Sequence, residues 1–243
     1  MKSVLASIKP KYCELIASGK KKVEVRKTKP KIETPFKVYI YCTESKSQNL
    51  MICNVKECYF DDWGHLETFL VNQRDYKTCF NEENRANGKV IGEFICDYIN
   101  TYEIEGYNSL ENVLQSIKRV EGEEDIDEDD ILYYFETSNE MEDANDCDLC
   151  KNSCLSFDEI GKYVCGNKEF GFYTFYGWHI SKLVIYEKPH YITNILKKPC
   201  VVDPCVNRGF CAGGTAICHE CKIKSAPQSW CYVEERAAKT NEL

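Results

Sequence analysis

The segment SIKPKYCELIASGKKKVEVRK, residues 7–27, carries the most informative structural signals of the chain. Pro10 opens a short stripe of apolar residues at helical spacing and Gly19 follows that stripe, so we predict a helix over residues 10–18. Residues 21–27 then alternate between apolar and charged side chains, which indicates a strand with one charged face. A helix that ends directly before such a strand places charged side chains at the mouth between the two elements.

The rest of the chain predicts several strands and few helices. Predicted strands cover residues 2–8, 36–43, 89–97 and 170–186, the last as one bent strand or as two strands in tandem. Predicted helices cover residues 64–86, the stripe from Leu110 to Ile117, and residues 157–164, where Ser156 and Glu159 form a capping-box pattern. This mixture favours an α+β fold, a small mixed β-barrel with peripheral helices.

Charge is segregated along the 243-residue chain, whose net charge is −8. Residues 1–40 carry a net charge of +8, whereas residues 101–148 carry −15 and include the run EGEEDIDEDD (121–130). Such an acidic run is typical of a solvated surface segment. The overall acidity argues against a nucleic-acid partner, but the local charge of the basic first forty residues does not.

The hydropathy pattern excludes a membrane-spanning protein. No apolar run approaches the roughly 18 residues that a spanning helix needs. The N-terminus also lacks the apolar core of about 7–15 residues that a secretory signal contains. We therefore expect a cytoplasmic protein, and we expect it to be monomeric.

The pattern Gly-x-Lys-x-x-Glu-x-Arg at Gly19, Lys21, Glu24 and Arg26 is the sharpest candidate for a binding site. Lysine and arginine at the end of a helix can hold a phosphate, and a glutamate beside them can accept a hydrogen bond from a base or a sugar. The alternative is a strip of surface ion pairs, which is common and carries no function.

These residues lie in a longer region that resembles the ASCH domain, a branch of the PUA-like superfamily. The resemblance rests on residues 7–27, FKVYIYCTE (36–44) and GKVIGEF (88–94). SFDEIGKYV, YGWHISKLVIYEKP and APQSWCYVEE further along are similar to a phage- and Firmicute-type subgroup. The resemblance implies one ASCH domain made of residues 1–100 and 155–243, interrupted by an acidic helical insertion at 101–154.

The family resemblance implies a small β-barrel with a cleft beside the Gly19–Arg26 motif, where RNA or a nucleotide binds. Some similar proteins are enzymes, either ribonucleases or acetylcytidine amidohydrolases that carry a lysine and a threonine in the motif. Lys21 matches that lysine, but Glu24 stands at the threonine position, and a carboxylate does not replace a hydroxyl nucleophile. We therefore favour a binding module over an enzyme, with an RNA-directed enzyme as the alternative.

Aromatic residues and a histidine are secondary candidates for the same site. Tyr39 and Tyr41 lie on the less apolar side of their strand and are candidates for base stacking. Trp178 is more typical of a core residue. His179 can serve as an acid–base group, although a hydrogen-bonded structural role is the simpler interpretation.

Sixteen cysteines in a chain without a secretory signal point to thiols or metal ligands and not to disulfides. Cys42, Cys53 and Cys96 lie in apolar strand patterns and are expected in the core. The Cys-rich loop at residues 199–224 contains a Cys-x-x-Cys pair, which offers two zinc ligands at the right spacing. We predict a structural zinc bound by Cys200, Cys205, Cys218 and Cys221, with Cys211 or His219 as substitutes. A second site at Cys147, Cys150, Cys154 and Cys165 is a weaker candidate.

The acidic segment allows a further interpretation from a different class of function. A chain of this kind can act as a phage adaptor whose acidic insertion binds a host protein, with the acidic run imitating a nucleic acid. Only the charge of residues 121–130 favours this alternative. Deleting that run separates the two possibilities, because partner binding is then lost and ligand binding at the motif is kept.

Overall fold

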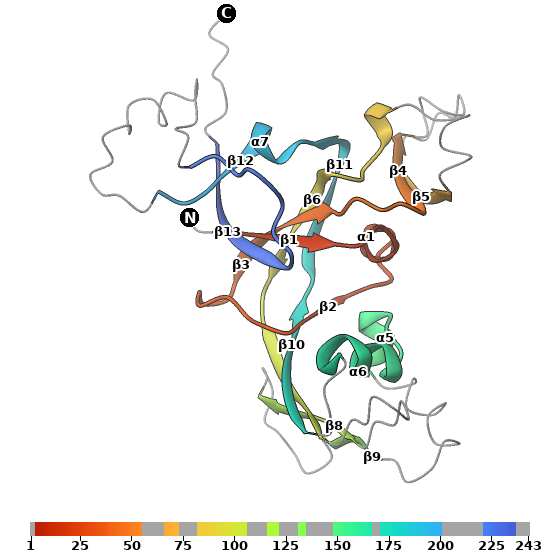
Figure 1. The fold of residues 1–243 in the computed structure, drawn as a ribbon, viewed down its shortest axis with the longest axis vertical. Coiled ribbons are helices and arrows are strands. Elements are labelled where there is room, and N and C mark those ends of the chain that lie inside the picture. The colour runs from red at the N-terminus through yellow and green to blue at the C-terminus, as the bar shows by residue number, and fades with distance from the viewer. Residues whose placement is uncertain are drawn as a thin grey trace, which may run out of the picture. The chain divides into compact units, whose positions relative to one another are not determined.

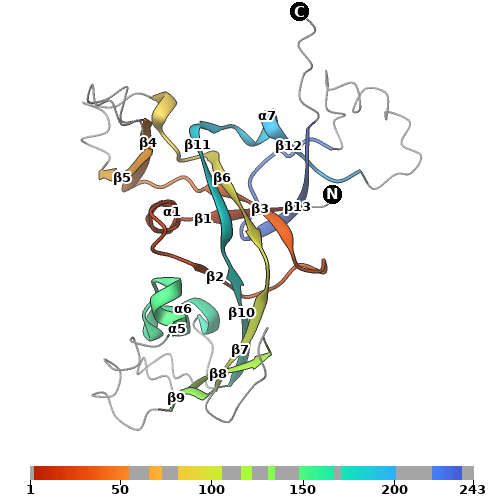
Figure 2. The ribbon, with the colours of Figure 1, turned by 180° about the vertical axis from the view of Figure 1, so that it is seen from behind.

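The computed structural model describes residues 3–54, 66–72, 82–105, 116–121, 131–134, 148–166, 171–200 and 221–236. The chain forms two compact units, which Figures 1 and 2 show from opposite sides. The first unit comprises residues 1–17, 36–94 and 183–243, and the second comprises residues 18–35 and 95–182. Segments that are distant in sequence therefore fold together in each unit.

The first unit is built on a six-stranded sheet with the strand order β11-β6-β3-β1-β13-β12. Its strands are β1 (Ser3–Ile8), β3 (Phe36–Cys42), β6 (Lys89–Cys96), β11 (Ser181–His190), β12 (Leu196–Lys197) and β13 (Trp230–Glu235). β1 runs parallel to β3 and antiparallel to β13, and all of its residues are buried. Burial on both faces is the reason that β1 lies inside the sheet and not at its edge.

Helix α1 (Pro10–Ala17) confirms the helix predicted over residues 10–18. Pro10 occupies the start of the helix, where a missing N–H costs no hydrogen bond. Pro10, Cys13 and Ile16 form its buried side. Gly19 follows with φ at +73°, a left-handed conformation that is common after helix ends.

Residues 66–72 correct the helix predicted over residues 64–86, because they form strand β5 (Leu66–Asn72). β5 pairs antiparallel with β4 (Gln48–Asn54), with Leu50 opposite Leu70. Only Glu82–Asn84, the 3-10 turn η1, is helical among the residues of that range that the structure describes. The pairing partner outweighs the polar composition of the segment, because strand preference depends strongly on cross-strand neighbours.

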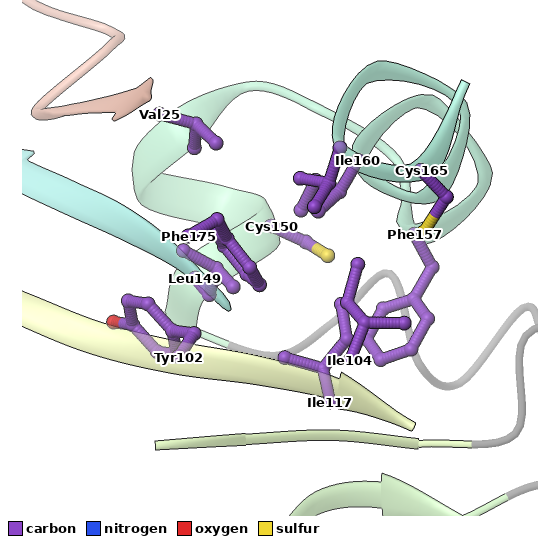
Figure 3. Packing of buried hydrophobic residues seen from close by; sticks show 11 residues of the cluster. Val25, Tyr102, Ile104, Ile117, Leu149, Cys150, Phe157, Ile160, Cys165 and Phe175 are labelled. Carbon is purple, nitrogen blue, oxygen red and sulfur yellow. The ribbon is translucent and has the colours of Figure 1, made fainter. Parts of the chain in front are cut away.

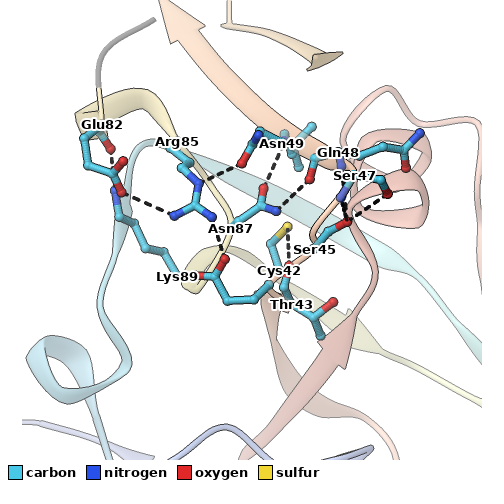
Figure 4. Close-up of polar contacts among 12 residues, drawn as sticks. Cys42, Thr43, Ser45, Ser47, Gln48, Asn49, Glu82, Arg85, Asn87 and Lys89 are labelled. Atoms are coloured by element: carbon cyan, nitrogen blue, oxygen red, sulfur yellow. Dashed lines mark hydrogen bonds and ion pairs between the residues drawn. The ribbon is translucent and has the colours of Figure 1, made fainter. Parts of the chain in front are cut away.

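A polar network joins the β4 strand to the segment that precedes β6 (Figure 4). The Asn87 side chain, 1% exposed, donates to the carbonyl of Gln48 at 2.9 Å and accepts from the amide of Leu50 at 2.8 Å. Arg85 Nε donates to Asn49 Oδ1 at 2.8 Å. These bonds satisfy buried polar groups that would otherwise cost about 1–3 kcal/mol each.

An apolar cluster of the first unit forms around the buried ring of Tyr39. It includes α7 (Ile192–Ile195) and the C-terminal strand β13. Its buried members are Leu5, Tyr39, Val90, Ile192, Leu196, Ile223 and Val233. Each large apolar side chain buried in this way stabilises the fold by about 1.5–3 kcal/mol.

The second unit contains a five-stranded sheet with the order β2-β10-β7-β8-β9. Its strands are β2 (Val23–Arg26), β7 (Ile99–Glu105), β8 (Ser116–Glu121), β9 (Ile131–Tyr134) and β10 (Phe172–His179). Every neighbouring pair in this sheet is antiparallel. The short strand β2, which carries Glu24 and Arg26 of the motif, therefore lies at one edge of the sheet.

Helices α5 (Asp148–Ser153) and α6 (Phe157–Cys165) pack on this sheet (Figure 3). The cluster between them contains Val25, Tyr102, Ile104, Ile117, Leu149, Cys150, Phe157, Ile160, Val164, Cys165 and Phe175. Because Val25 points into this core, Glu24 and Arg26 point to the opposite face of β2. The core thus fixes the direction of the charged side chains.

The stripe from Leu110 to Ile117 is not helical where the structure describes it. Ile117 belongs to β8 and pairs with Ile104 of β7, while residues 110–115 lie outside the described residues. Ile117 is buried in the core of the second unit. Cross-strand packing of that side chain outweighs the helical spacing of the stripe.

Several other local predictions are confirmed. Ser156 and Glu159 form both hydrogen bonds of the capping box at the start of α6. The predicted strand over residues 170–186 is two strands in tandem, β10 and β11, separated by Ile180. In the part of the chain that the structure describes, no helix has the length and apolar character needed to cross a bilayer. Cys42, Cys53 and Cys96 are buried, as expected of core residues.

Candidate binding site at the edge strand

The position of the motif depends on backbone hydrogen bonds on both sides of Lys22. The Lys22 amide donates to the carbonyl of Asn152 at 2.7 Å, and the amide of Ile180 donates to the Lys22 carbonyl at 2.8 Å. Just beyond this point, β2 pairs antiparallel with β10. The α5 helix and the β10 strand therefore hold the motif from two sides.

Lys21, Glu24 and Arg26 form a compact ion-pair cluster, named the triad from here on. Lys21 Nζ lies 3.5 Å from Glu24 Oε2, and Arg26 Nη2 lies 3.0 Å from Glu24 Oε1. The residues are 2%, 7% and 4% exposed, respectively. The sequence correctly grouped the three side chains, but they are buried and not a strip of surface ion pairs.

Lys21 is anchored more firmly than the ion pair alone provides. Its ammonium donates to the carbonyl of Ser153, the last residue of α5, at 2.6 Å. Burial lowers the pKa of Lys21, and the charge of Glu24 opposes that effect only in part. The lysine is therefore held in one position by two acceptors at the end of a helix, where a cation is also favoured by the helix dipole.

The triad carries two positive charges against one carboxylate. A buried charge without a counter-charge is costly, and a buried ion pair is stable only when its geometry and hydrogen bonds are good. A lysine and an arginine that share one carboxylate offer several N–H donors to an anion. Phosphate matches these donors because arginine and lysine both bind its oxygens through charge-assisted hydrogen bonds.

The neighbouring strand places aromatic residues beside the triad. In the register of β2 and β10, Tyr176 lies opposite Arg26 and Trp178 lies opposite Glu24. Trp178 is fully buried, as its predicted core role requires, whereas Tyr176 is half-buried. The sequence analysis did not select Tyr176. The alternation of β10 would have placed it on the same face as Trp178, but only the strand pairing puts it beside Arg26.

Tyr39 and Tyr41 belong to the first unit, whereas the triad belongs to the second. Tyr39 is 2% exposed, and its hydroxyl donates a hydrogen bond to Glu235. Burial and this carboxylate raise the pKa of Tyr39. A ring so covered offers little surface to a base. Tyr41 is half-buried, and its role in stacking stays a prediction.

His179 has the hydrogen-bonded role that the sequence analysis favoured. Its Nδ1 lies 2.6 Å from Asp97 Oδ1, and its ring stacks on Tyr98 with 4.4 Å between the centroids. Burial, the largest single effect, raises the pKa of Asp97, but the hydrogen bonds from His179, Ser181 and the Asp97 backbone, together with the charge of His179, outweigh it and the pKa is lowered. Asp97 was missed because it is distant in sequence from His179.

The predicted zinc site lies mostly outside the described residues. Cys200 is exposed and Cys221 is buried, while Cys205, Cys211, Cys218 and His219 fall in the range that the structure does not describe. For the weaker second site, Cys150 and Cys165 pack in the apolar core, and Cys147 is not described. Among the described residues, no three His, Cys, Asp or Glu side chains form a metal-binding group.

The comparison with protein families bears directly on the triad, because it covers the helix and strand that position these residues. Residues 7–108 match the ASCH domain. The match includes the whole of α1, β2, β3 and β6. No curated protein and no solved structure matches the chain. The mixed α+β structure of the described residues, with a six-stranded sheet and few helices, fits a PUA-like fold. The phage- and Firmicute-type subgroup stays a prediction.

Proposed function

We propose that this protein binds RNA through a phosphate group held at the triad. The single observation that carries the proposal is a buried cluster with two cations and one carboxylate at the edge of a sheet. The match to the ASCH domain, for which RNA binding is the expected function, supports the same conclusion. A nucleotide offers the same phosphate and is the smallest ligand of this class.

Each member of the triad has a distinct role in the proposal. Arg26 supplies a planar group that can donate two parallel hydrogen bonds to one phosphate. Lys21 supplies a second positive charge, fixed by the carbonyl of Ser153. Glu24 holds the two cations in place and is the acceptor available to a sugar hydroxyl or a base N–H.

RNA binding by an Arg26→Gln variant tests the proposal. The affinity for single-stranded RNA should fall by about tenfold or more, because a charge-assisted contact is lost. The slope of log K against log salt should become less steep by about 0.7, the value for one phosphate contact on a single strand. Fluorescence anisotropy titrations at several salt concentrations measure both quantities.

Lys22→Gln is the matched control for that experiment. Lys22 is exposed, lies in the same segment and contributes only its backbone to the site. Near-ultraviolet circular dichroism establishes that each variant is folded before its affinity is compared. Equal loss of affinity in both variants would show that general positive charge, and not the triad, binds RNA.

An enzyme acting on RNA or on a modified nucleoside, of the ribonuclease or the amidohydrolase type, is the alternative function. Both oxygens of Glu24 lie beside cations, with Lys21 at Oε2 and Arg26 at Oε1. The hydroxyl nucleophile of the amidohydrolases is absent from this position, and amide hydrolysis needs a nucleophile or an activated water. These features favour recognition over catalysis.

We expect no useful deacetylation of acetylcytidine by the unmodified protein. Chromatography that detects the deacetylated product is a sufficient measurement. Steady turnover that disappears in Glu24→Gln would assign the protein to the hydrolases. If Glu24→Gln changes only the affinity for the ligand, the Glu24 carboxylate is a recognition group and not a catalytic one.

The acidic segment and the cysteine-rich loop enter the proposal only as separate features. A protein partner for residues 121–130 rests on their charge alone. A structural zinc at Cys200, Cys205, Cys218 and Cys221 rests on the spacing of the cysteines. The proposal of phosphate binding at the triad rests on neither feature.

A further inference from the structure

Two lysine–tyrosine pairs lie next to the triad, in the same compact unit. Lys27 Nζ lies 5.4 Å from the centroid of the Tyr163 ring, and Lys29 Nζ lies 5.2 Å from that of Tyr176. Both lysines follow β2 directly and are exposed. These four residues are named the ledge from here on.

The tyrosines connect the ledge to the triad. Tyr176 stands opposite Arg26 in the register of β10 and β2. Tyr163, on α6, is 39% exposed, and burial raises its pKa while the charges of Arg26 and Glu24 also act on its hydroxyl. Tyr176 therefore lies beside Arg26, and Tyr163 is close enough to the triad for the charges of Arg26 and Glu24 to act on its hydroxyl.

The charge of this region differs from that of the chain as a whole. Residues 18–35 contain seven lysines and arginines against two glutamates. Lys20, Lys22, Lys27, Lys29 and Lys31 are all exposed. A local surplus of positive charge attracts a polyanion even though the whole chain has a net charge of −8.

Partly exposed aromatic rings beside exposed lysines are a combination that suits single-stranded RNA. Unpaired bases stack on aromatic side chains, and lysines pair with the phosphates between the bases. The bases of a duplex are stacked on one another, so their faces cannot stack on the tyrosine rings. An acidic peptide would use the lysines but has no flat groups to stack on the tyrosines.

We propose that the ledge is a second subsite that binds the nucleotides of single-stranded RNA adjacent to the one held at the triad, with bases stacked on Tyr163 and Tyr176 and phosphates paired with Lys27 and Lys29. The inference rests on the proposed function, because the triad sets the starting point of the strand. On binding, each ring exchanges a weak contact with an ammonium group for a base. The released ammonium group then pairs with the neighbouring phosphate.

A comparison of two probes tests the ledge separately from the triad. The probes are uridine 5′-monophosphate, which is long enough only for the triad, and a short oligouridylate that reaches the ledge. In the double variant Tyr163→Leu/Tyr176→Leu, the affinity for the oligouridylate should fall by about tenfold or more. The affinity for the monophosphate should stay unchanged.

Two controls address folding and the nature of the contact. Tyr191 is an exposed tyrosine in the first unit whose ring lies 5.4 Å from Lys89 Nζ, so Tyr191→Leu removes a lysine–tyrosine pair that is not part of the ledge. It should leave both affinities unchanged. Tyr163→Phe/Tyr176→Phe keeps the rings and should bind the oligouridylate as the unmodified protein does.

Salt titrations test the two lysines of the ledge. Lys27→Ala and Lys29→Ala should each reduce the slope of log K against log salt by about 0.7 for the oligouridylate, and should leave the slope for the monophosphate unchanged. Both side chains are exposed, so the variants should fold normally.

The possible failures are distinguishable. If Arg26→Gln weakens both probes but the double leucine variant weakens neither, the ledge is wrong and the triad stands. If the double variant weakens both probes equally, the rings act through the triad and form no separate subsite. If a polyglutamate peptide binds as tightly as RNA, and its affinity is the same for the tyrosine variants as for the unmodified protein, binding depends on charge alone and the ledge proposal is wrong. If the unmodified protein binds neither probe, the proposed function fails together with the ledge.

Discussion

Lys21 and Arg26 place two positive charges on opposite oxygens of one buried carboxylate, Glu24. Removing one partner of such a buried arrangement typically costs about 3–5 kcal/mol, because the remaining charge loses its counter-charge. The triad is therefore a rigid part of the fold as well as a candidate ligand site. A binding group that is already positioned loses less entropy when the ligand arrives.

At the same scale, Asp97 and His179 form a pair whose contribution to stability depends on pH. The pKa of Asp97 in the folded protein lies below its ordinary value of 3.8. A carboxyl group with a lowered pKa stabilises the folded state above its ordinary pKa, and this contribution is lost as the pH falls through the folded value. The relevant pH window therefore lies below about 4.

Asp97→Asn should reduce the free energy of unfolding by about 1 kcal/mol near pH 7, a modest value because the side chain is partly exposed. The difference from the unmodified protein should shrink as the pH falls below about 4. Urea unfolding at a series of pH values measures this difference in the free energy of unfolding. Glu33→Gln, at an exposed position, serves as control. A difference that is the same at every pH would show that the charge of Asp97 does not stabilise the fold.

The sequence predicted part of the triad at the residue scale. Glu24 and Arg26 are two positions apart on a strand, so alternation alone places them on one face. Their burial was not predictable, because it depends on tertiary packing. The carbonyl that holds Lys21 belongs to Ser153, which is 132 residues away in the chain. No local pattern indicates that contact.

At the scale of elements, local signals and cross-strand signals behaved differently. α1 and α6 were predicted because Pro10 and the Ser156–Glu159 capping box lie within the elements that they begin. Strands β5 and β8 were not predicted, because their conformation depends on the strands that pair with them. The pairing supplies packing and hydrogen bonds that no residue inside β5 or β8 displays.

Gly92 makes a close approach between β6 and β11 possible. A Cβ atom at this position would lie 2.3 Å from the carbonyl oxygen of Val184 and 3.1 Å from the Cα atom of Ile185. Backbone atoms cannot move aside as a flexible side chain can. A glycine at this position of β6 is therefore a packing requirement.

Gly92→Ala should lower the free energy of unfolding by about 1–3 kcal/mol, the usual cost of overpacking a core, because β11 must move away from β6. Chemical denaturation measures the loss. Gly171→Ala is the control, since its nearest contact is the Tyr173 hydroxyl at an ordinary 3.4 Å. Equal stability of Gly92→Ala and the unmodified protein would contradict the close approach.

At the scale of the whole molecule, the compact units do not follow the order of the chain. The predicted segments 1–100, 101–154 and 155–243 describe a domain with an insertion, and the insertion stays a prediction. Each unit is assembled from segments far apart in sequence. Composition and periodicity report on neighbours along the chain, so they cannot indicate how such segments combine.

Residues 199–224 have a sequence that offers little apolar core of its own, so we predict that a zinc ion holds this loop together. Protein purified without chelators should contain about one zinc per chain, since four cysteine ligands complete a tetrahedral site. Removing the metal should increase proteolysis within this loop while the RNA affinity stays unchanged. Elemental analysis and limited proteolysis measure the two effects. A reduced preparation that contains no metal would contradict the prediction.

The central claim is that Arg26 holds a phosphate. The most direct test compares the affinities of uridine 5′-monophosphate and uridine for the unmodified protein and for Arg26→Gln, by calorimetry. The unmodified protein should prefer the monophosphate by about tenfold to a hundredfold, as expected for a charge-assisted contact. In Arg26→Gln that preference should largely disappear, while the affinity for uridine stays the same. A preference for the phosphate that survives unchanged in the variant would contradict the claim.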